Sequence, residues 1–376
     1  MRVAIIAESF LPLVNGVTNS VLRVLEHLAE NGHDARVIAP GAMGKCPAEV
    51  CGFPVTRLAS VNMPGYAGVQ IATTPSYALE RILEDFQPDV VHLAAPFNVG
   101  YRGALAVSRL ELPSVAIYQT EVPSYAARYG VPHAEALLWW RVRQAHNLAT
   151  MTLAPSSFAR NQLIEQGVQR VGIWGRGVDS VRFHPSKRSQ QWRDRVAPHG
   201  ERIILYVGRL APEKQVGDLQ VLADLPNTRI AIVGSGPSQD ELETFLPGAV
   251  FLGHQGGEDL ATAYASADLF VTPGELETFG QTIQEAMASG LPVIAPARGG
   301  PLDLINPSRT GWLYSPGDLA SLRRHARDLL GDERKRQAFG TRARQSVEHR
   351  TWDYMCDQLL DYYREAIETA PRLSAA

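Results

Sequence analysis

Short apolar runs alternate with helical patterns along this chain, and they do so in two successive series. In the first half the runs are Val3–Ala7, Ala35–Ala39, Val55–Leu58, Val90–Leu93, Ser114–Tyr118 and Met151–Ala154. In the second half they are Ile203–Val207, Arg229–Val233, Val250–Leu252, Leu269–Thr272, Pro292–Ala295 and Gly311–Tyr314. Most runs lack the alternation of half-exposed strands, so they should be buried on both faces of a parallel sheet. The sequence therefore predicts an α/β protein with two doubly wound domains.

The length of the chain also favours two domains, because 376 residues are too many for one compact core. Between the two series lies a polar segment, residues 185–200, which contains two prolines and has the composition of a linker. We therefore expect an N-terminal domain at residues 1–184 and a C-terminal domain at residues 201–351. The last predicted helix, residues 352–370, is expected to pack back on the first domain.

Composition places the chain among soluble globular proteins, with 45% hydrophobic and 20% charged residues. A net charge of −3 disfavours nucleic acid as a partner, because nucleic-acid binders normally carry a basic surplus. The three cysteines show no C-x-x-C spacing, which indicates a reducing compartment. The first residues lack a signal-peptide pattern, and no apolar stretch reaches the length of a membrane span. We therefore expect a cytoplasmic protein.

Two acids eight residues apart, Glu277 and Glu285, mark an informative strand-to-helix junction. The segment E-T-F-G-Q-T-I-Q-E follows an apolar strand and a turn at Pro273–Gly274, and its pattern predicts a helix that carries Glu285. Ligands of open α/β sheets bind outside the carboxyl ends of the strands, so both acids should face a ligand. Main-chain N–H groups at the helix start should hold an anion, namely those of Thr278, Phe279 and Gly280. The alternative is an acid that complements the helix dipole, followed by an ordinary surface acid.

A second junction supplies positive charge at another strand end. The strand at 203–207 runs into G-R-L-A-P-E-K, which contains Gly208, Arg209 and Lys214. Glycine allows a ligand to approach the main chain, and the planar fork of arginine and the compact charge of lysine complement a diphosphate. Taken alone, the two bases also fit a solvated loop.

Neither a nicotinamide site nor a metal site is easy to build from this chain. The segment V-G-S-G-P (233–237) and the first loop, with its single Gly16, both lack the G-x-G-x-x-G pattern. No D-x-D pair follows a strand, and the ten histidines are scattered. We therefore expect no cofactor and no metal, so that Arg209, Lys214 and helix N-termini would neutralise a bound diphosphate.

Segments along nearly the whole chain resemble, in order, the family 4 retaining glycosyltransferases of the GT-B type. They are E-S-F-L-P-L-V-N-G-V (8–17), F-Q-P-D-V-V-H-L (86–93), A-P-S-S-F (154–158), G-V-D-S-V-R-F-H-P (177–185), G-R-L-A-P-E-K (208–214) and E-T-F-G-Q-T-I-Q-E-A-M-A-S-G-L-P-V-I-A (277–295). The resemblance implies a GT-B fold, with two Rossmann-like domains facing each other across a cleft, and a nucleotide-sugar donor. It implies that Glu277 contacts the transferred sugar, that Glu285 contacts the ribose, and that Gly16, Arg209 and Lys214 hold the diphosphate.

Retaining transfer in this family resembles a front-face displacement, in which the departing diphosphate helps to deprotonate the acceptor and no protein nucleophile is required. By this resemblance Arg209, Lys214 and Glu277 would stabilise the leaving group and orient the sugar. Many relatives place a histidine where this chain has Gln119, which can hydrogen-bond a sugar but cannot carry a proton. His254, in the G-H-Q turn, would lie near the base.

Two further segments suggest a donor and an acceptor. Y-Q-T (118–120) and W-G-R-G-V-D (174–179) resemble the actinobacterial α-mannosyltransferases that use GDP-mannose to build glycolipids and lipomannan-like cores. We therefore expect transfer of mannose from GDP-mannose to a glycolipid acceptor. Two alternatives remain: a UDP-sugar-dependent glycolipid synthase, resembling sulfoquinovosyl-diacylglycerol synthases, and a non-catalytic nucleotide-binding protein on the same scaffold.

A lipid acceptor implies contact with an anionic membrane surface, and the protein would then be peripheral on the inner face of the cell membrane. The first domain offers an apolar, loop-like segment at residues 61–71. It also offers the helical segment A-L-L-W-W-R-V-R (136–143), in which tryptophans lie beside arginines: Trp139, Trp140, Arg141 and Arg143. The alternative is a buried helix face from which Arg143 points outward.

Overall fold

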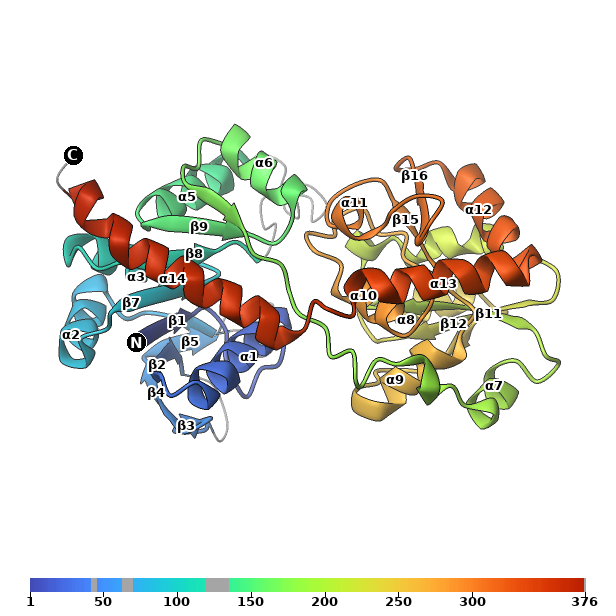
Figure 1. Ribbon diagram of the computed structural model, residues 1–376, viewed down its shortest axis with the longest axis horizontal. Helices are drawn as coiled ribbons and strands as arrows, with labels where there is room; N and C mark the ends of the chain where they lie inside the picture. The colour runs from blue at the N-terminus through green and yellow to red at the C-terminus, as the bar shows by residue number, and fades with distance from the viewer. Residues whose placement is uncertain (42–45, 63–69, 120–134, 375–376) are drawn as a thin grey trace. The chain divides into compact units, whose positions relative to one another are not determined.

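The computed structural model describes residues 1–41, 46–62, 70–119 and 135–374, and the chain divides into two compact units (Figure 1). The first unit combines Met1–Gly175 with Asp353–Ala376, and the second unit is Arg176–Trp352. The chain therefore passes into the second unit once and returns to the first unit at its C-terminal end. Each unit contains a largely parallel sheet covered by helices.

In the described part of the first unit, eight strands form a sheet in the order β10-β9-β8-β7-β1-β2-β4-β3. These strands are β1 (Arg2–Ala7), β2 (Asp34–Pro40), β3 (Glu49–Val50), β4 (Phe53–Leu58), β7 (Val90–Ala94), β8 (Ser114–Ile117), β9 (Met151–Ala154) and β10 (Val171–Ile173). Neighbouring strands are parallel except β3 and β4. A separate antiparallel pair joins β5 (Ser60–Asn62) to β6 (Gln70–Ala72). The helices are α1 (Gly16–Glu30), α2 (Ser76–Phe86), α3 (Val99–Arg109), α5 (Glu135–Asn147), α6 (Ser157–Glu165) and α14 (Trp352–Ser374).

The central strand β1 is buried because helices cover both faces of the sheet. Ile6 packs in a core with apolar side chains of α2 and α3, including Leu83 and Val99. Helix α1 contacts β1 and β2 through an apolar stripe that includes Val24 and Leu28. The continuous apolar runs of the sequence reflect this burial on both faces.

The C-terminal helix α14 is fixed to the first unit by buried polar contacts. The hydroxyl of Tyr363 lies 2.7 Å from Nδ1 of His92, and both side chains are buried. The indole Nε1 of Trp174 donates to the carbonyl oxygen of Met355 at 2.7 Å. The last helix of the chain therefore packs on the first unit.

The second unit, all of which the structure describes, has six parallel strands in the order β13-β12-β11-β14-β15-β16. They are β11 (Arg202–Val207), β12 (Thr228–Val233), β13 (Val250–Phe251), β14 (Leu269–Val271), β15 (Val293–Pro296) and β16 (Gly311–Tyr314). The α-helices are α7 (Gln190–Val196), α8 (Gln239–Phe245), α9 (Gly257–Ser266), α10 (Gln281–Ala288), α11 (Pro301–Leu304), α12 (Leu319–Gly331) and α13 (Glu333–Val347). Short 3-10 helices are η2 (Pro185–Lys187), η3 (Pro212–Lys214) and η4 (Val216–Leu222).

Successive side chains of β11 enter two separate cores. Ile203 and Leu205 pack in one core, and Ile204 and Tyr206 pack in the other. Because all six strands are parallel, their carboxyl ends lie at one edge of the sheet.

The predicted α/β class is confirmed. Each of the twelve strands predicted from apolar runs corresponds to an observed strand, with ends that agree within two residues. Sequence reasoning missed the short strands β3, β5, β6 and β10. These strands have two or three residues each, which is too short for a pattern to be recognised.

Residues 185–200 are not the linker that their polar composition suggested. They form η2 and α7 and belong to the second unit, which begins at Arg176. Trp192 and Val196 are buried in its core, and the guanidinium of Arg193 lies 2.9 Å from Oδ2 of the buried Asp268. Composition misled the prediction because a two-turn helix on a core needs only a few apolar residues.

Candidate active site

Loops that follow β11, β12, β14 and β15 meet through main-chain contacts at the carboxyl edge of the second sheet. A Cβ atom on Gly234, where φ is 141°, would lie 1.9 Å from the carbonyl oxygen of Gly208. A Cβ atom on Gly299, where φ is 70°, would lie 2.2 Å from the carbonyl oxygen of Glu277. Only glycine permits such close approaches. The loops therefore form one continuous surface, built from the second unit alone, where the sequence predicts a ligand.

Lys214 and Glu277, predicted from separate strand ends, are brought together on this surface. The ammonium Nζ of Lys214 lies 2.7 Å from Oε2 of Glu277, and about a fifth of each side chain is exposed, 21% and 23%. The main chain of each residue is also hydrogen-bonded, because the N–H of Gly300 donates to the carbonyl oxygen of Glu277 at 2.7 Å and the N–H of Lys214 donates to that of Ala211 at 2.9 Å. The site thus contains a preformed, partly accessible ion pair.

Arg209 lies on the same loop as Lys214 and is more exposed, at 58%. Its Nη1 is 3.7 Å from Oε1 of the buried Glu213. The hydroxyl of Tyr206 donates to the carbonyl oxygen of Arg209 at 3.1 Å, and the N–H of Gly208 donates to Val233 at 3.0 Å. The main chain at Arg209 is therefore fixed, while its guanidinium extends toward solvent and can meet an anion.

Glu285 lies on α10 and receives a hydrogen bond at each carboxylate oxygen. The hydroxyl of Tyr264 donates to Oε2 at 3.1 Å, and Nε2 of Gln281 donates to Oε1 at 3.4 Å. Burial raises the pKa of Glu285 to about 7, although both hydrogen bonds and the nearby Arg182 favour its charged form. Burial and the Glu285 carboxylate also raise the pKa of Tyr264, so Tyr264 remains a hydroxyl donor.

The helix that carries Glu285 begins later than the sequence suggested. Helix α10 starts at Gln281, and Thr278, Phe279 and Gly280 form a loop before it. Gly280 has φ of 96°, a left-handed conformation that a right-handed helix does not contain. The predicted anion site at a helix start is thus a loop. Within the described residues, no hydrogen bond from the N–H groups of these three residues is found.

His254 is exposed in a turn next to the loop that follows β12. The carbonyl oxygen of Gly253 accepts a hydrogen bond from the N–H of Gly234 at 2.8 Å, which ties this turn to the carboxyl edge. The structure therefore brings His254 to the same edge as Gly208.

Gly16 and Gln119 belong to the first unit. Gly16 is the first residue of α1, whose start is capped by Asn15 through hydrogen bonds from Val17 and Thr18, each 3.0 Å long. Gln119 follows β8, is 8% exposed, and precedes residues 120–134, which lie outside the described ranges.

Sequence reasoning missed the role of Glu8, at the carboxyl end of β1. Its carboxylate accepts hydrogen bonds from the N–H groups at the start of α3, with distances of 2.9 Å from Asn98 and 3.2 Å from both Val99 and Gly100. Burial raises the pKa of Glu8, against the effect of these bonds. The start of α3 is therefore occupied by a protein carboxylate. The signal in the sequence was a Glu at the end of a predicted strand, because a carboxylate there can accept hydrogen bonds from the N–H groups at the start of a helix.

Arg176, in the segment W-G-R-G-V-D, was not predicted as a site residue, but its charge interacts with that of Glu277. Burial lowers the pKa of Arg176, and the negative charge of Glu277 opposes that shift. Its main chain is held by Gln284, whose Nε2 donates to the carbonyl oxygen of Arg176 at 2.9 Å.

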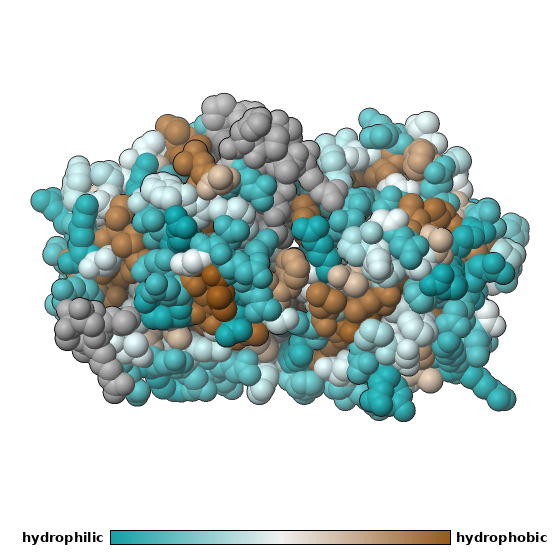
Figure 2. All heavy atoms as spheres, turned by 90° about the horizontal axis from the view of Figure 1, so that it is seen from above, coloured by the Kyte–Doolittle hydropathy of each residue, from teal (hydrophilic) through white to brown (hydrophobic). Residues whose placement is uncertain are grey.

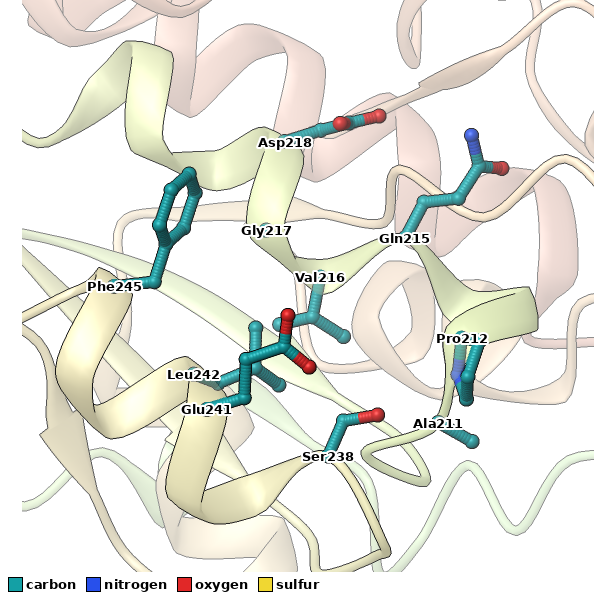
Figure 3. Close-up of a pocket in the computed structure, with 10 residues that line it drawn as sticks. All are labelled: Ala211, Pro212, Gln215, Val216, Gly217, Asp218, Ser238, Glu241, Leu242 and Phe245. Atoms are coloured by element: carbon teal, nitrogen blue, oxygen red, sulfur yellow. The ribbon is translucent and has the colours of Figure 1, made fainter.

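A pocket of 290 Å³ lies between the segment that contains η3 and η4 and helix α8 (Figure 3). Its polar lining includes the carboxyl side chains of Asp218 and Glu241, and no lining residue is basic. The pocket is therefore poorly suited to a diphosphate. No cluster of three His, Cys, Asp or Glu side chains that could hold a metal ion occurs among the described residues.

The two tryptophans of α5 have different environments. Trp139 is buried at 6% and stacks on Tyr118, with ring centroids 6.4 Å apart, so it belongs to the core. Trp140 is 45% exposed and Leu137 is 65% exposed, and the guanidinium of Arg141 lies 3.4 Å from the ring centroid of Tyr101. Most of the segment at 61–71 lies outside the described ranges. In the part of the chain that the structure covers, no helix is long and apolar enough to span a bilayer.

Known proteins resemble both halves of the chain. Residues 14–182 match Glycosyltransferase Family 4, and residues 188–346 match Glycosyl transferases group 1. The chain is 48% identical to the GDP-mannose-dependent alpha-mannosyltransferase of Mycobacterium tuberculosis, with 100% of this chain and 99% of that protein aligned. It is 36% identical to the sulfoquinovosyl transferase SQD2 of Arabidopsis thaliana, over 93% of this chain and 71% of that protein. Sucrose-phosphate synthase from Thermosynechococcus elongatus shares the fold, with a TM-score of 0.82, 20% identity, and coverage of 97% of this chain and 98% of that chain.

Proposed function

The chain belongs to the glycosyltransferases of group 1 and family 4, and on that premise we propose that it is a retaining α-mannosyltransferase that uses GDP-mannose. The observation that carries the proposal is 48% identity, along the whole chain, to a relative whose name states that donor and that sugar. The site supports it, because bases suited to a diphosphate, Arg209 and Lys214, share a loop beside Glu277, an acid suited to sugar hydroxyls. Glu285 belongs to the same region, since its charge and that of Glu277 both act on Tyr264.

In the proposed reaction the bond between mannose C1 and the diphosphate oxygen breaks, and a bond from an acceptor hydroxyl to C1 forms on the same face. The departing diphosphate accepts the proton of the acceptor, so no protein nucleophile takes part. Positive charge develops on the sugar and negative charge on the leaving oxygen. Arg209 and Lys214 would stabilise the leaving group, and Glu277 would orient the sugar hydroxyls.

The ion pair between Lys214 and Glu277 fits these roles. An ammonium group has three donors, so Lys214 can keep Glu277 and still donate to a phosphate oxygen. A bound donor would then connect both residues, with its diphosphate on Lys214 and its sugar on Glu277. The pair also aligns the two groups before the donor binds, which reduces the reorganisation that the reaction requires.

We also propose that transfer requires no metal and no other cofactor. Two basic side chains supply the positive charge that a divalent cation would otherwise place on the leaving group. Transfer measured in the presence of a chelator should keep its rate. A rate that disappears with chelator and returns with added Mg²⁺ would contradict this part of the proposal.

The donor nucleotide is tested by titrating the purified protein with GDP and with UDP in the presence of chelator. Guanine and uracil differ in size and in their hydrogen-bonding edges, so a site built for one should discriminate against the other. We expect GDP to bind more tightly. A preference for UDP would favour a UDP-sugar-dependent glycolipid synthase, the alternative that similarity to the Arabidopsis protein suggests. Binding of GDP without any transfer of mannose would favour the non-catalytic alternative.

We further propose a glycolipid acceptor and peripheral contact with an anionic membrane surface at the cytoplasmic face. Exposed Leu137 and Trp140 lie three residues apart on α5, next to Arg141, as in helices that lie on membranes. Separate apolar patches interrupt the hydrophilic surface in the view of Figure 2, so exposed apolar side chains alone do not identify a membrane contact.

Sedimentation with phosphatidylglycerol vesicles tests this contact. Replacing Leu137 and Trp140 together by Ser should weaken binding several-fold. The control is Phe245→Ser, which removes an apolar side chain of the second unit that is 47% exposed, and should leave binding unchanged. An equal loss in both proteins would contradict a specific contact through α5.

A further inference from the structure

The side chain of Gln281 connects an acid of the site to a distant part of the second unit. Gln281 is the first residue of α10, and its Nε2 lies 3.4 Å from Oε1 of Glu285 and 3.1 Å from the carbonyl oxygen of Gly177. A carbonyl oxygen can only accept, and so can an ionised carboxylate, whereas the amide nitrogen carries two hydrogens. These two neighbours therefore fix the orientation of the amide and can both be satisfied at once.

Gly177 lies where the chain enters and leaves the second unit. A Cβ atom on Gly177 would lie 2.4 Å from Cα of Trp352, so the two passages of the chain touch through their main chains. The N–H of Val178 donates to the carbonyl oxygen of Arg350 at 2.8 Å, which adds a second link between them. The amide of Gln281 is thus bonded to the place where these two segments meet, which we call the chain crossing: residues 177–178 and 350–352.

We propose that Gln281 is a positioning residue, which holds Glu285 for nucleotide binding and anchors it to this chain crossing. The inference rests on the proposed function, because that function assigns Glu285 to the ribose. A carboxylate accepts hydrogen bonds from ribose hydroxyls best when it is ionised. Gln281 favours the ionised state by donating to it, in concert with Tyr264 on α9 and with the charge of Arg182.

A further charged group, Glu277, acts on Tyr264, one of the two hydrogen-bond donors to Glu285. The negative charge of Glu277 helps to raise the pKa of Tyr264, so this hydroxyl stays protonated and remains a donor to Glu285. Loss of the Gln281 donor, with all these groups in place, should shift the ionisation of Glu285 further toward high pH. Nucleotide binding near neutral pH should then weaken, because more of the protein carries a protonated Glu285.

The test is titration with GDP from about pH 6 to about pH 9 for the full-length protein and two variants. Gln281→Met removes the donor and keeps the length of the side chain. Gln284→Met is the control, because Gln284 lies on the same helix and donates to the chain crossing at Arg176, but not to Glu285. Near pH 7, Gln281→Met should bind GDP about three- to tenfold more weakly than the wild type, and at high pH the difference should shrink.

Two outcomes would overturn the proposal. One is a pH profile of Gln281→Met that matches the wild type, and the other is an equal shift in Gln284→Met, which would show that the crossing alone is responsible. If the wild type binds no GDP at any pH, the proposed function fails instead. The pH dependence of unfolding, compared between wild type and Gln281→Met, then still reports the ionisation of Glu285 and tests the role of Gln281 without a ligand.

Discussion

At the scale of single residues, Lys214 separates a catalytic contribution from a structural one. Lys214→Ala should lower kcat by about 10²- to 10³-fold, because it removes a positive charge from the leaving group. The free energy of unfolding should fall by no more than about 2 kcal/mol, because solvent still reaches both members of the pair with Glu277. Arg323→Gln is the control, since it breaks an ion pair with Asp224 away from the site. Activity and stability that fall together in Lys214→Ala would contradict the assigned role.

The raised pKa of Glu285 should make the stability of the protein depend on pH. Its pKa is about 7 in the folded protein and near 4.5 in an unfolded chain, so the folded state retains a proton that the unfolded state releases. Stability is therefore lost as pH rises from about 4.5 to about 7. Glu285→Gln should be more stable than the wild type by about 1 to 3 kcal/mol near pH 8, and little different near pH 4.5. Thermal unfolding of both proteins across this pH range checks the prediction. A stability difference between wild type and Glu285→Gln that stays constant at all pH values would be inconsistent with the raised pKa.

At the scale of elements, two buried histidines make the first unit sensitive to acid. Burial lowers the pKa of His92 on β7 and of His146 on α5 to about 3. Below about pH 6.5 the unfolded chain binds protons at both positions while the folded chain does not, so stability falls as pH falls. His146→Gln should reduce this dependence by about 1 kcal/mol per pH unit. Denaturant unfolding at pH 7.5 and 5.5 measures the difference, and an equal loss of unfolding free energy in the wild type and in His146→Gln would refute it.

The elements also show what could be read from the sequence. Strands such as β1 and β11 were predictable because burial on both faces requires continuous apolar runs. The start of α10 was not, because the left-handed φ of Gly280 depends on how the neighbouring loops pack and leaves no periodic signal. Residues 185–200 were misread for a related reason: the contacts of Trp192 and Arg193 are formed with distant segments.

At the scale of the whole molecule, the order of the strands brings together site residues that are far apart in the sequence. Lys214 and Glu277 are 63 residues apart, but β11 and β14 are neighbours in the sheet, so their carboxyl ends place the two side chains 2.7 Å apart. Proximity to the carboxyl edge was predictable from topology, and the pairing itself was not. The bond from Gln281 to Gly177 was also unpredictable, because it connects positions that only the fold brings together.

The most direct test of the central claim is transfer of radiolabelled mannose from GDP-mannose to a lipid extract, with chelator present. The purified wild-type protein should produce a labelled, α-linked glycolipid, and Lys214→Ala should produce it at least about a hundredfold more slowly. UDP-sugars should give no product under the same conditions. Transfer from a UDP-sugar and not from GDP-mannose, or equal product from wild type and Lys214→Ala, would contradict the account.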